Sequence, residues 1–381
     1  MLRIKKVYIT CTAGQARLCA DISLNGRGTA LWFGVDEKQS EYLCAERSDA
    51  FVMTLLPTAM RGGHQIICET PMSERLHYQL ENYLIPSLCS AGDLYRPVSI
   101  EAPLTSERIN GKNGTGTGFS GGVDSLYSIM THGKDSTYPV THLALFNVGV
   151  FEGEGYREGF FKSCRNAVRF SQETGLELVC LDSNLPEALP ERFLDVYSFR
   201  NLAAAMALQG LFARYLLSSG HDIANFSFDL HNSATYDMLT VHCAQTESLS
   251  FYLSGGQTKR ADKLKALSDW EPSHRWLHPC VYGHVGNKNC GHCKKCARDM
   301  TTLYALGTLE RFEAVFDLPA YKKALPQRIG FVMANKGNHL YDETLALLEE
   351  NGVPVPAAAY VFEKQFLNAM RNLSEAQKTN E

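Results

Sequence analysis

The chain has 381 residues, more than one hydrophobic core usually spans, so we expect two or three structural units. Its composition, 45 % hydrophobic and 20 % charged, is that of an ordinary globular protein and excludes long disordered or collagen-like stretches. With 37 Lys and Arg against 41 Asp and Glu, the net charge of −4 gives no general attraction to a nucleic-acid backbone, so any such binding must be local.

The beginning of the chain predicts a small N-terminal α+β domain over residues 1–113. Short apolar runs favour strands, longer apolar stretches favour helices, and Ser73 is placed to cap the second helix. A turn-forming stretch that is nearly free of apolar side chains sets the domain boundary. The expected strands are at residues 7–9, 18–22 and 30–33, and the expected helices at 48–60 and 73–88.

Residues 114–310 alternate between strand-like and helix-like patterns, which predicts an α/β domain with a parallel sheet and helices on both faces. Residues 311–381 are expected to form a C-terminal helical extension, with helices near 340–350 and 359–370. The elements expected in the α/β domain are a strand ending at 118–119, a helix over 125–130, a strand over 141–151, a helix over 156–174, a strand over 176–181, a helix over 200–217 and a strand over 222–228.

No segment is predicted to cross a membrane. The longest apolar stretch, residues 202–217, is interrupted by Gln209, Gly210 and Arg214 and is shorter than a helix that spans a bilayer. The first residues place basic side chains ahead of polar ones and lack the apolar stretch of a secretory signal. We therefore expect a cytoplasmic protein.

A glycine-rich turn, SGGVDS at residues 120–125, joins the first strand of the parallel sheet to its first helix. Two glycines let successive amides turn toward one anion, while the hydroxyls of Ser120 and Ser125 and the helix N-terminus add donors and partial positive charge. Asp124 would repel phosphates unless a divalent cation, here Mg²⁺, lies between them. The turn predicts a bound nucleotide polyphosphate with Mg²⁺; a plain strand-to-helix turn with a polar cap is the alternative. The Walker pattern is absent, which disfavours γ-phosphate transfer.

Other polar residues are expected near this turn, because ligands of open parallel sheets bind beyond the carboxyl ends of the strands. Asn147 ends the second expected strand, and Arg200 and Asn201 open the apolar helix after the third. Asp229 and His231 follow the fourth expected strand. An ordinary turn role is the alternative for Asn147.

A run of cations at residues 258–263 precedes another expected helix. Arg260 or Lys263 would neutralise the charge of a leaving pyrophosphate. The alternative is a solvated helix start.

Four of the twelve cysteines crowd together, at Cys280, Cys290, Cys293 and Cys296. The short spacings let one loop and the following helix start supply three tetrahedral thiolate ligands, and Cys280 would close the shell from a preceding strand. Four thiolates leave Zn²⁺ no open position, so a structural zinc site is predicted, with an iron–sulfur cluster as the alternative. The other eight cysteines are scattered and are expected to be reduced thiols.

The SGGVDS turn resembles the SGGxDS loop of the PP-loop ATP pyrophosphatases, which have an adenine nucleotide alpha hydrolase-like fold. Together with Arg200 and Asn201, the cation run and the cysteine segment, it is similar in order and spacing to the 7-cyano-7-deazaguanine synthase family over residues 115–311. The resemblance implies that the ATP phosphates and Mg²⁺ are held by Ser120, Gly121, Gly122, Asp124 and Ser125, and structural zinc by the four clustered cysteines.

In that family, ATP activates 7-carboxy-7-deazaguanine as an adenylate, and ammonia then gives an amide and a nitrile. This chain departs from the pattern, because more than a hundred residues precede Ser120 and residues 228–232 replace the family's Tyr-Pro-Asp-Cys-Arg segment near the base-binding region. For this reason Asp229 and His231 are the expected substrate-binding residues. In these departures the chain resembles extended members of the family, which occur in bacterial antiphage operons of the Qat and type IV CBASS systems. The resemblance to the latter implies an amide bond between a deazaguanine and a protein amine.

We therefore expect an ATP-dependent ligase that adenylates a heterocyclic carboxylate, releases pyrophosphate and passes the acyl group to ammonia or to an acceptor protein. Asp124 would hold Mg²⁺, and Arg260 or Lys263 would neutralise developing charge. One alternative is a nucleotide-binding module that contacts RNA or a partner protein without turnover. Another is a PP-loop enzyme that modifies a tRNA base.

Overall fold

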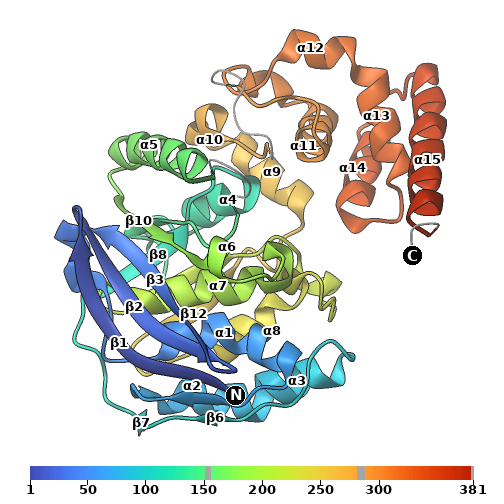
Figure 1. Cartoon of the computed structure of the whole chain (residues 1–381). Coiled ribbons are helices and arrows are strands. Elements are labelled where there is room, and N and C mark those ends of the chain that lie inside the picture. Colours follow the sequence, from blue (N-terminus) through green and yellow to red (C-terminus); the bar gives the residue numbers. More distant parts are fainter. Residues whose placement is uncertain (151–155, 281–287, 379–381) are drawn as a thin grey trace. The chain divides into compact units, whose positions relative to one another are not determined.

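The computed structural model describes residues 1–150, 156–280 and 288–378, with side chains described up to residue 372. The chain divides into two compact units (Figure 1). Unit 1 comprises Met1–Phe119 and Thr131–Gly256, and unit 2 comprises Ser120–Met130 and Gln257–Glu381.

Unit 1 is an α/β structure on a large sheet, for which the described residues give ten strands in the order β12-β11-β8-β9-β10-β3-β2-β1-β4-β6. The strands from β12 to β10 are parallel, those from β10 to β1 pair antiparallel, and β1, β4 and β6 are again parallel. The strands of residues 1–113 thus continue the same sheet, with Gly34 opposite Asp182. The strand bounds are β1 Leu2–Thr12, β2 Gln15–Leu24, β3 Arg27–Asp36, β4 Ile66–Cys68, β6 Ile100–Glu101, β8 Gly114–Gly118, β9 His142–Phe146, β10 Glu177–Ser183, β11 Phe212–Ser218 and β12 Ser250–Ser254, and β5 Met72–Ser73 pairs separately with β7 Leu104–Thr105.

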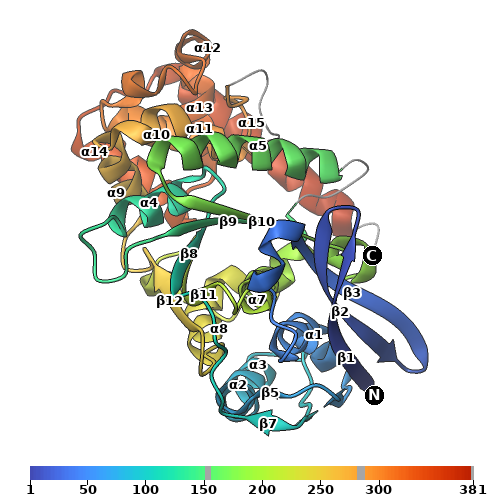
Figure 2. The ribbon, with the colours of Figure 1, turned by 90° about the vertical axis from the view of Figure 1, so that its left-hand side faces the viewer.

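Helices cover both faces of the sheet in unit 1. Figures 1 and 2 show α5 on one face of the parallel strands, and α7 with α1 on the other. Alternation explains the burial in the N-terminal strands, since Leu18 and Phe33 pair across β2 and β3 and are fully buried, and the Phe33 ring packs 5.5 Å from that of Phe51 in α1. The helix bounds are α1 Asp49–Gly62, α2 Glu74–Gln79, α3 Ile85–Ser90, α5 Tyr156–Thr174, α6 Leu185–Ala188, α7 Phe193–Ala207 and α8 Asp237–Cys243.

Most of the expected elements of unit 1 are confirmed, including the three N-terminal strands, the first helix and the helix over 156–174. Ser73 caps α2 as predicted, because its hydroxyl accepts a hydrogen bond from the amide of Leu76 at 3.0 Å. The helix expected over 73–88 is continuous in the chain but contains a π-helical segment, Leu80–Leu84, between α2 and α3.

Two expected elements after residue 199 are wrong. The helix predicted over 200–217 is the end of α7 followed by strand β11, and the strand predicted over 222–228 is a 3₁₀ turn, Ile223–Asn225, with irregular backbone after it. An apolar run that is buried on all sides fits a helix and a central strand equally well, so the pattern could not separate them. The break falls at Gly210, whose amide donates to the carbonyl oxygen of Tyr42 at 3.1 Å.

Unit 2 is helical in its described residues. The helices expected near 340–350 and 359–370 are confirmed as α14 and α15. In the part of the chain that the structure describes, no helix has both the length and the apolar character to span a bilayer. The bounds are α4 Val123–Thr131, α9 Arg260–Ser268, α10 Glu271–Trp276, α11 Lys294–Ala305, α12 Leu318–Lys323, α13 Leu325–Ala334, α14 His339–Glu350 and α15 Ala357–Lys378.

Candidate functional site

The sheet of unit 1 has a topological switch point at β8. From β8 the chain adds β9 and β10 on one side, and it then returns to add β11 and β12 on the other side. Open α/β sheets bind ligands beyond the carboxyl ends of the strands where the order reverses in this way. The chain passes from β8 directly through Phe119 into the SGGVDS turn, so the turn follows the strand at which the sheet order reverses.

The turn is held by its two serines. The Ser120 and Ser125 hydroxyl oxygens lie 3.1 Å apart, the Ser120 amide donates to Ser125 Oγ at 3.4 Å, and the Gly122 amide donates to Ser120 Oγ at 3.2 Å. Two of the turn's amides therefore have acceptors within the turn. Among the described residues, the amides of residues 123–125 have no acceptor, as is usual in the first turn of a helix. These amides at the start of α4 are the donors left for an anion.

Gly121 is the residue that permits this path. Its φ of +70° lies in the left-handed region, which side chains with a Cβ rarely adopt. A Cβ at this position would also lie 3.2 Å from the carbonyl oxygen of Trp276, so the turn and the end of α10 approach closely. Only glycine satisfies both conditions without strain.

Asp124 is bound by the two predicted cations. Arg260 Nη1 donates to Oδ2 at 2.8 Å and Lys263 Nζ donates to Oδ1 at 2.9 Å, so each carboxylate oxygen faces one cation. Burial alone would raise the pKa of Asp124, but Arg260 and Lys263 outweigh it and hold that pKa well below its usual range. The carboxylate is therefore ionised at neutral pH and fixes both cations beside the turn.

Asp299 completes this charge network, and the sequence patterns did not indicate it. It is fully buried in α11 and accepts from Arg260 Nε at 3.1 Å, from Arg260 Nη2 at 2.9 Å and from Arg298 Nε at 3.0 Å. Burial would raise the pKa of Asp299, yet the two arginines outweigh it and lower that pKa. The residues around Asp299, Arg298 before it and Met300 after it, form no motif that would single it out.

The four predicted cysteines lie together in unit 2. Their sulfur atoms are all within 4.8 Å of one another, and Cys290 Sγ is 3.9 Å from Cys296 Sγ. Tetrahedral zinc with bonds of about 2.3 Å would place its sulfur ligands about 3.8 Å apart. Cys280 comes from irregular backbone rather than from the strand that was expected.

The backbone around the cysteines also suits a metal. The Cys293 amide donates to Cys290 Sγ at 3.3 Å, and the Cys296 amide donates to Cys293 Sγ at 3.4 Å. Burial raises the pKa of the Cys296 thiol, so its thiolate form requires a compensating cation. The cluster can therefore hold a metal ion such as zinc.

The remaining predicted residues belong to unit 1. Asn147 is fully buried and donates from Nδ2 to Asp182 Oδ1 at 2.6 Å. Arg200 lies within α7 rather than at its start, because the helix begins seven residues earlier at Phe193. The Arg200 guanidinium is buried, with Nη1 donating to the Val148 carbonyl at 3.4 Å and Nη2 to Glu191 Oε2 at 3.4 Å. Asn201 Nδ2 donates to the carbonyl of Tyr197 one turn earlier, at 2.8 Å.

Asp229 and His231 lie on an exposed loop well beyond β11, because the strand that was expected to precede them does not form. Asp229 Oδ1 accepts from the His231 amide at 3.0 Å, as in a turn. The His231 side chain is 65 % exposed, and its Nδ1 is 3.8 Å from Asp195 Oδ2. Both side chains are accessible to a ligand in unit 1.

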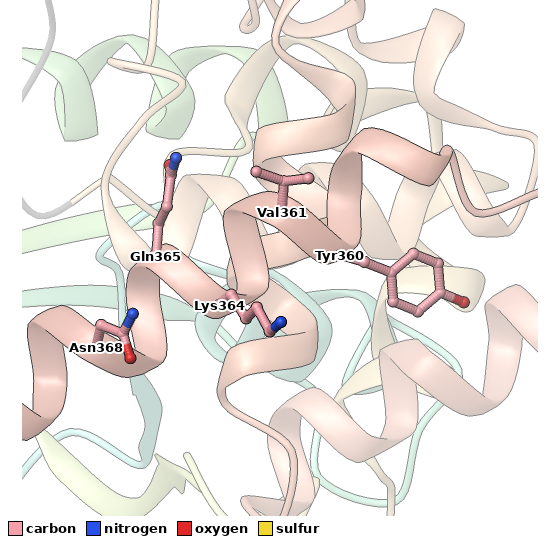
Figure 3. A pocket seen from close by; sticks show the side chains of 5 residues that line it. All are labelled: Tyr360, Val361, Lys364, Gln365 and Asn368. Atoms are coloured by element: carbon pink, nitrogen blue, oxygen red, sulfur yellow. The ribbon is translucent and has the colours of Figure 1, made fainter.

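The described residues also form two pockets. Among these residues, none of the predicted site residues lines either pocket. One, of about 940 Å³, lies in unit 1 between α5 and the ends of β2 and β3, with Arg17, Trp32 and Arg157 among its lining. The other, of about 330 Å³, lies along one side of α15 in unit 2 (Figure 3). Its lining is Tyr360, Val361, Lys364, Gln365 and Asn368.

Comparison of the chain with protein-family models, with curated proteins and with solved structures gives no match in any of the three. The functional interpretation therefore depends on the residues of this chain.

Proposed function

We propose that the protein is an ATP-dependent ligase of the PP-loop type, which adenylates a carboxylate and releases pyrophosphate. The observation that carries the proposal is the charge arrangement beside the SGGVDS turn. Arg260 and Lys263 are both held on Asp124, the second residue of the helix whose first amides are left for an anion. Amides, a guanidinium and an ammonium in one place favour a polyanion such as pyrophosphate.

In the first step a carboxylate oxygen of the substrate attacks the α-phosphorus of ATP. The bond from the α-phosphorus to the bridging oxygen breaks, and its electron pair leaves with pyrophosphate. The α4 amides, Arg260 and Lys263 would stabilise the charge that develops on this leaving group. In the second step an amine attacks the acyl carbon and loses a proton to solvent, the bond from the acyl carbon to the bridging oxygen breaks, and AMP leaves with the former carboxylate oxygen as the amide forms.

Two metals belong to the proposal. Mg²⁺ bound with the nucleotide would neutralise further phosphate charge, and Asp124 is the carboxylate that we propose to face it. Zn²⁺ at Cys280, Cys290, Cys293 and Cys296 would have a structural role, because four thiolates leave no position open for substrate. Asn147, Arg200 and Asn201 are proposed to contribute to ATP binding, and Asp229 and His231 to substrate binding, on the family resemblance alone.

The resemblance also supplies the substrates. We propose 7-carboxy-7-deazaguanine or a similar heterocyclic acid as the acyl donor, and ammonia or a protein amine as the acceptor. If the acceptor is a protein, the resemblance to the antiphage relatives leads us to propose a role in antiphage defence, in the cytoplasm. The turn and its cations bear on the ATP half of the reaction and not on the acceptor.

The test is incubation of the metal-loaded protein with ATP, Mg²⁺ and 7-carboxy-7-deazaguanine, with products analysed by chromatography and mass spectrometry. We expect AMP and pyrophosphate in equal amounts. Release of ADP, or no turnover by protein with a full metal site, would contradict the proposal. Tight ATP binding without AMP would instead favour a nucleotide-binding module, and label transfer to tRNA would favour the tRNA-modifying alternative.

A further inference from the structure

Two segments of unit 2 connect the cysteine cluster to the glycine-rich turn. The first lies just before Cys280. The amide of His278 donates to the carbonyl oxygen of Gly121 at 2.6 Å, and the Trp276 carbonyl packs against the same glycine. The position of Gly121 is therefore tied to backbone that lies two residues from a metal ligand.

The second connection runs through α11. This helix begins with Cys293 as its N-cap, and the Cys293 sulfur accepts from the amide of Cys296 in the first turn. Three residues after Cys296, Asp299 accepts two hydrogen bonds from Arg260, whose remaining nitrogen, Nη1, donates to Asp124. A short stretch of rigid helix thus links two cysteines to the first turn of α4.

The two segments are also joined to each other. Asn289 is buried next to Cys290, and its Nδ2 donates to the carbonyl oxygens of Leu277 and Val315, both at 2.9 Å. This bond holds the backbone before Cys280 close to the backbone before the cysteine trio. A metal bound to all four sulfurs would connect Cys280 to Cys290, Cys293 and Cys296. It would therefore fix both segments at once.

We propose that Asp299 is a positioning residue for Arg260 and Asp124, and that a metal at the four cysteines preorganises the glycine-rich turn for pyrophosphate through Asp299 and through the His278 amide. Pyrophosphate as the ligand rests on the proposed function; the mechanical link does not. The metal then acts on nucleotide binding although no substrate touches it. Loss of the metal would loosen the turn before it unfolds the protein.

The experiment compares metal-loaded protein, metal-free protein and the variant Asp299→Asn. Its matched control is Asp269→Asn, which also removes a carboxylate partner of an arginine in unit 2, since Asp269 pairs with Arg311 at 2.7 Å on an exposed surface. Pyrophosphate and ATP binding are measured by calorimetry, hydrogen exchange is measured for peptides covering residues 119–130, and metal content and thermal unfolding are recorded for each sample.

We expect pyrophosphate affinity to fall about tenfold in the metal-free protein and in Asp299→Asn, because the charged hydrogen bonds that orient Arg260 are weakened. Exchange in residues 119–130 should accelerate in both, while Asp269→Asn should behave as the parent protein. Unchanged exchange and unchanged affinity in folded, metal-free protein would overturn the inference.

Failure of the variant to fold and failure of the parent protein to bind pyrophosphate have different consequences. Should Asp299→Asn not fold, Asn289→Ala removes only the side-chain bonds to Leu277 and Val315 and so tests the link through the His278 segment, while the metal-free protein tests both links together. Should the metal-loaded parent protein bind no pyrophosphate, the proposed function fails. Exchange in residues 119–130 with and without metal would then still decide whether the cysteine site positions the turn.

Discussion

Asp49 gives a pH dependence of stability that can be calculated in advance. It is buried at the first position of α1, where Oδ1 accepts from the Ser73 amide at 2.9 Å and Oδ2 accepts from Gln209 Nε2 at 3.2 Å. No cation lies within ion-pair distance of it among the described residues. Burial raises the pKa of Asp49 from 3.8 to about 6, more than these two bonds lower it.

The sign follows from the proton count. Between pH 4 and pH 6 the folded protein keeps the Asp49 proton while the unfolded chain has lost it, so stability falls as the pH rises through this window and is constant above it. A difference of about two pK units corresponds to about 3 kcal/mol of the free energy of unfolding. Asp49→Asn carries no titrating group and should lack this slope.

The measurement is the free energy of unfolding of unit 1 from pH 4 to pH 7, obtained by hydrogen exchange of the α1 amides in the parent protein and in Asp49→Asn. In the variant, the amide nitrogen of the new asparagine would face the Gln209 donor, which costs about 1 kcal/mol at every pH. The test is therefore how the difference between the two free energies of unfolding changes with pH, and not its absolute value. The parent protein should lose about 2 kcal/mol relative to the variant between pH 4 and pH 7, because the unfolded carboxyl is already more than half ionised at pH 4. A flat difference curve would refute the reasoning.

Three further predictions concern unit 2. Lys263→Met should lower kcat/KM for AMP formation about a hundredfold, because it removes a cation beside the turn. Lys265→Met changes an exposed position of the same helix, and its kcat/KM in the same assay should stay within about twofold of that of the parent protein. Gly121→Ala should weaken ATP binding about tenfold in calorimetry, because a Cβ at a φ of +70° is strained and meets the Trp276 carbonyl; equal affinity would show that the turn tolerates a side chain. Cys293→Ser should reduce bound metal from about one ion per chain to well below one and lower the thermal stability of unit 2, and full metal content in elemental analysis would argue against the four-cysteine site.

Sequence patterns predicted elements whose signal is local. Helix α5 occupies the expected residues, Tyr156–Thr174, because its apolar residues recur at helical spacing along one face. The four cysteines come together as expected, and the two-residue spacings account for Cys290, Cys293 and Cys296. The helix expected over 125–130 is α4, Val123–Thr131, which begins two residues earlier; the glycine, serine and aspartate residues indicated a tight turn into a helix.

The misses come from contacts that are distant in the sequence. Helix α7 and strand β11 are both buried on all sides, so neither period was visible across residues 200–217. Asp299 acquires its role from Arg260, 39 residues away, and nothing near Asp299 in the chain marks that partner. The antiparallel pairing of β10 with β3 likewise depends on where the sheet places them, which neither strand's own residues specify.

The pairing of β3 with β10 has a practical consequence for shortened chains. A fragment starting at residue 114 would retain the SGGVDS turn but would leave β10 as an unprotected sheet edge, a known template for aggregation. It would also uncover the side of α7 that packs on α1, where Asp195 would lose Arg61 at 2.6 Å and keep the more distant Arg192 at 3.6 Å. Expression of a chain trimmed of its first hundred residues should therefore yield insoluble material.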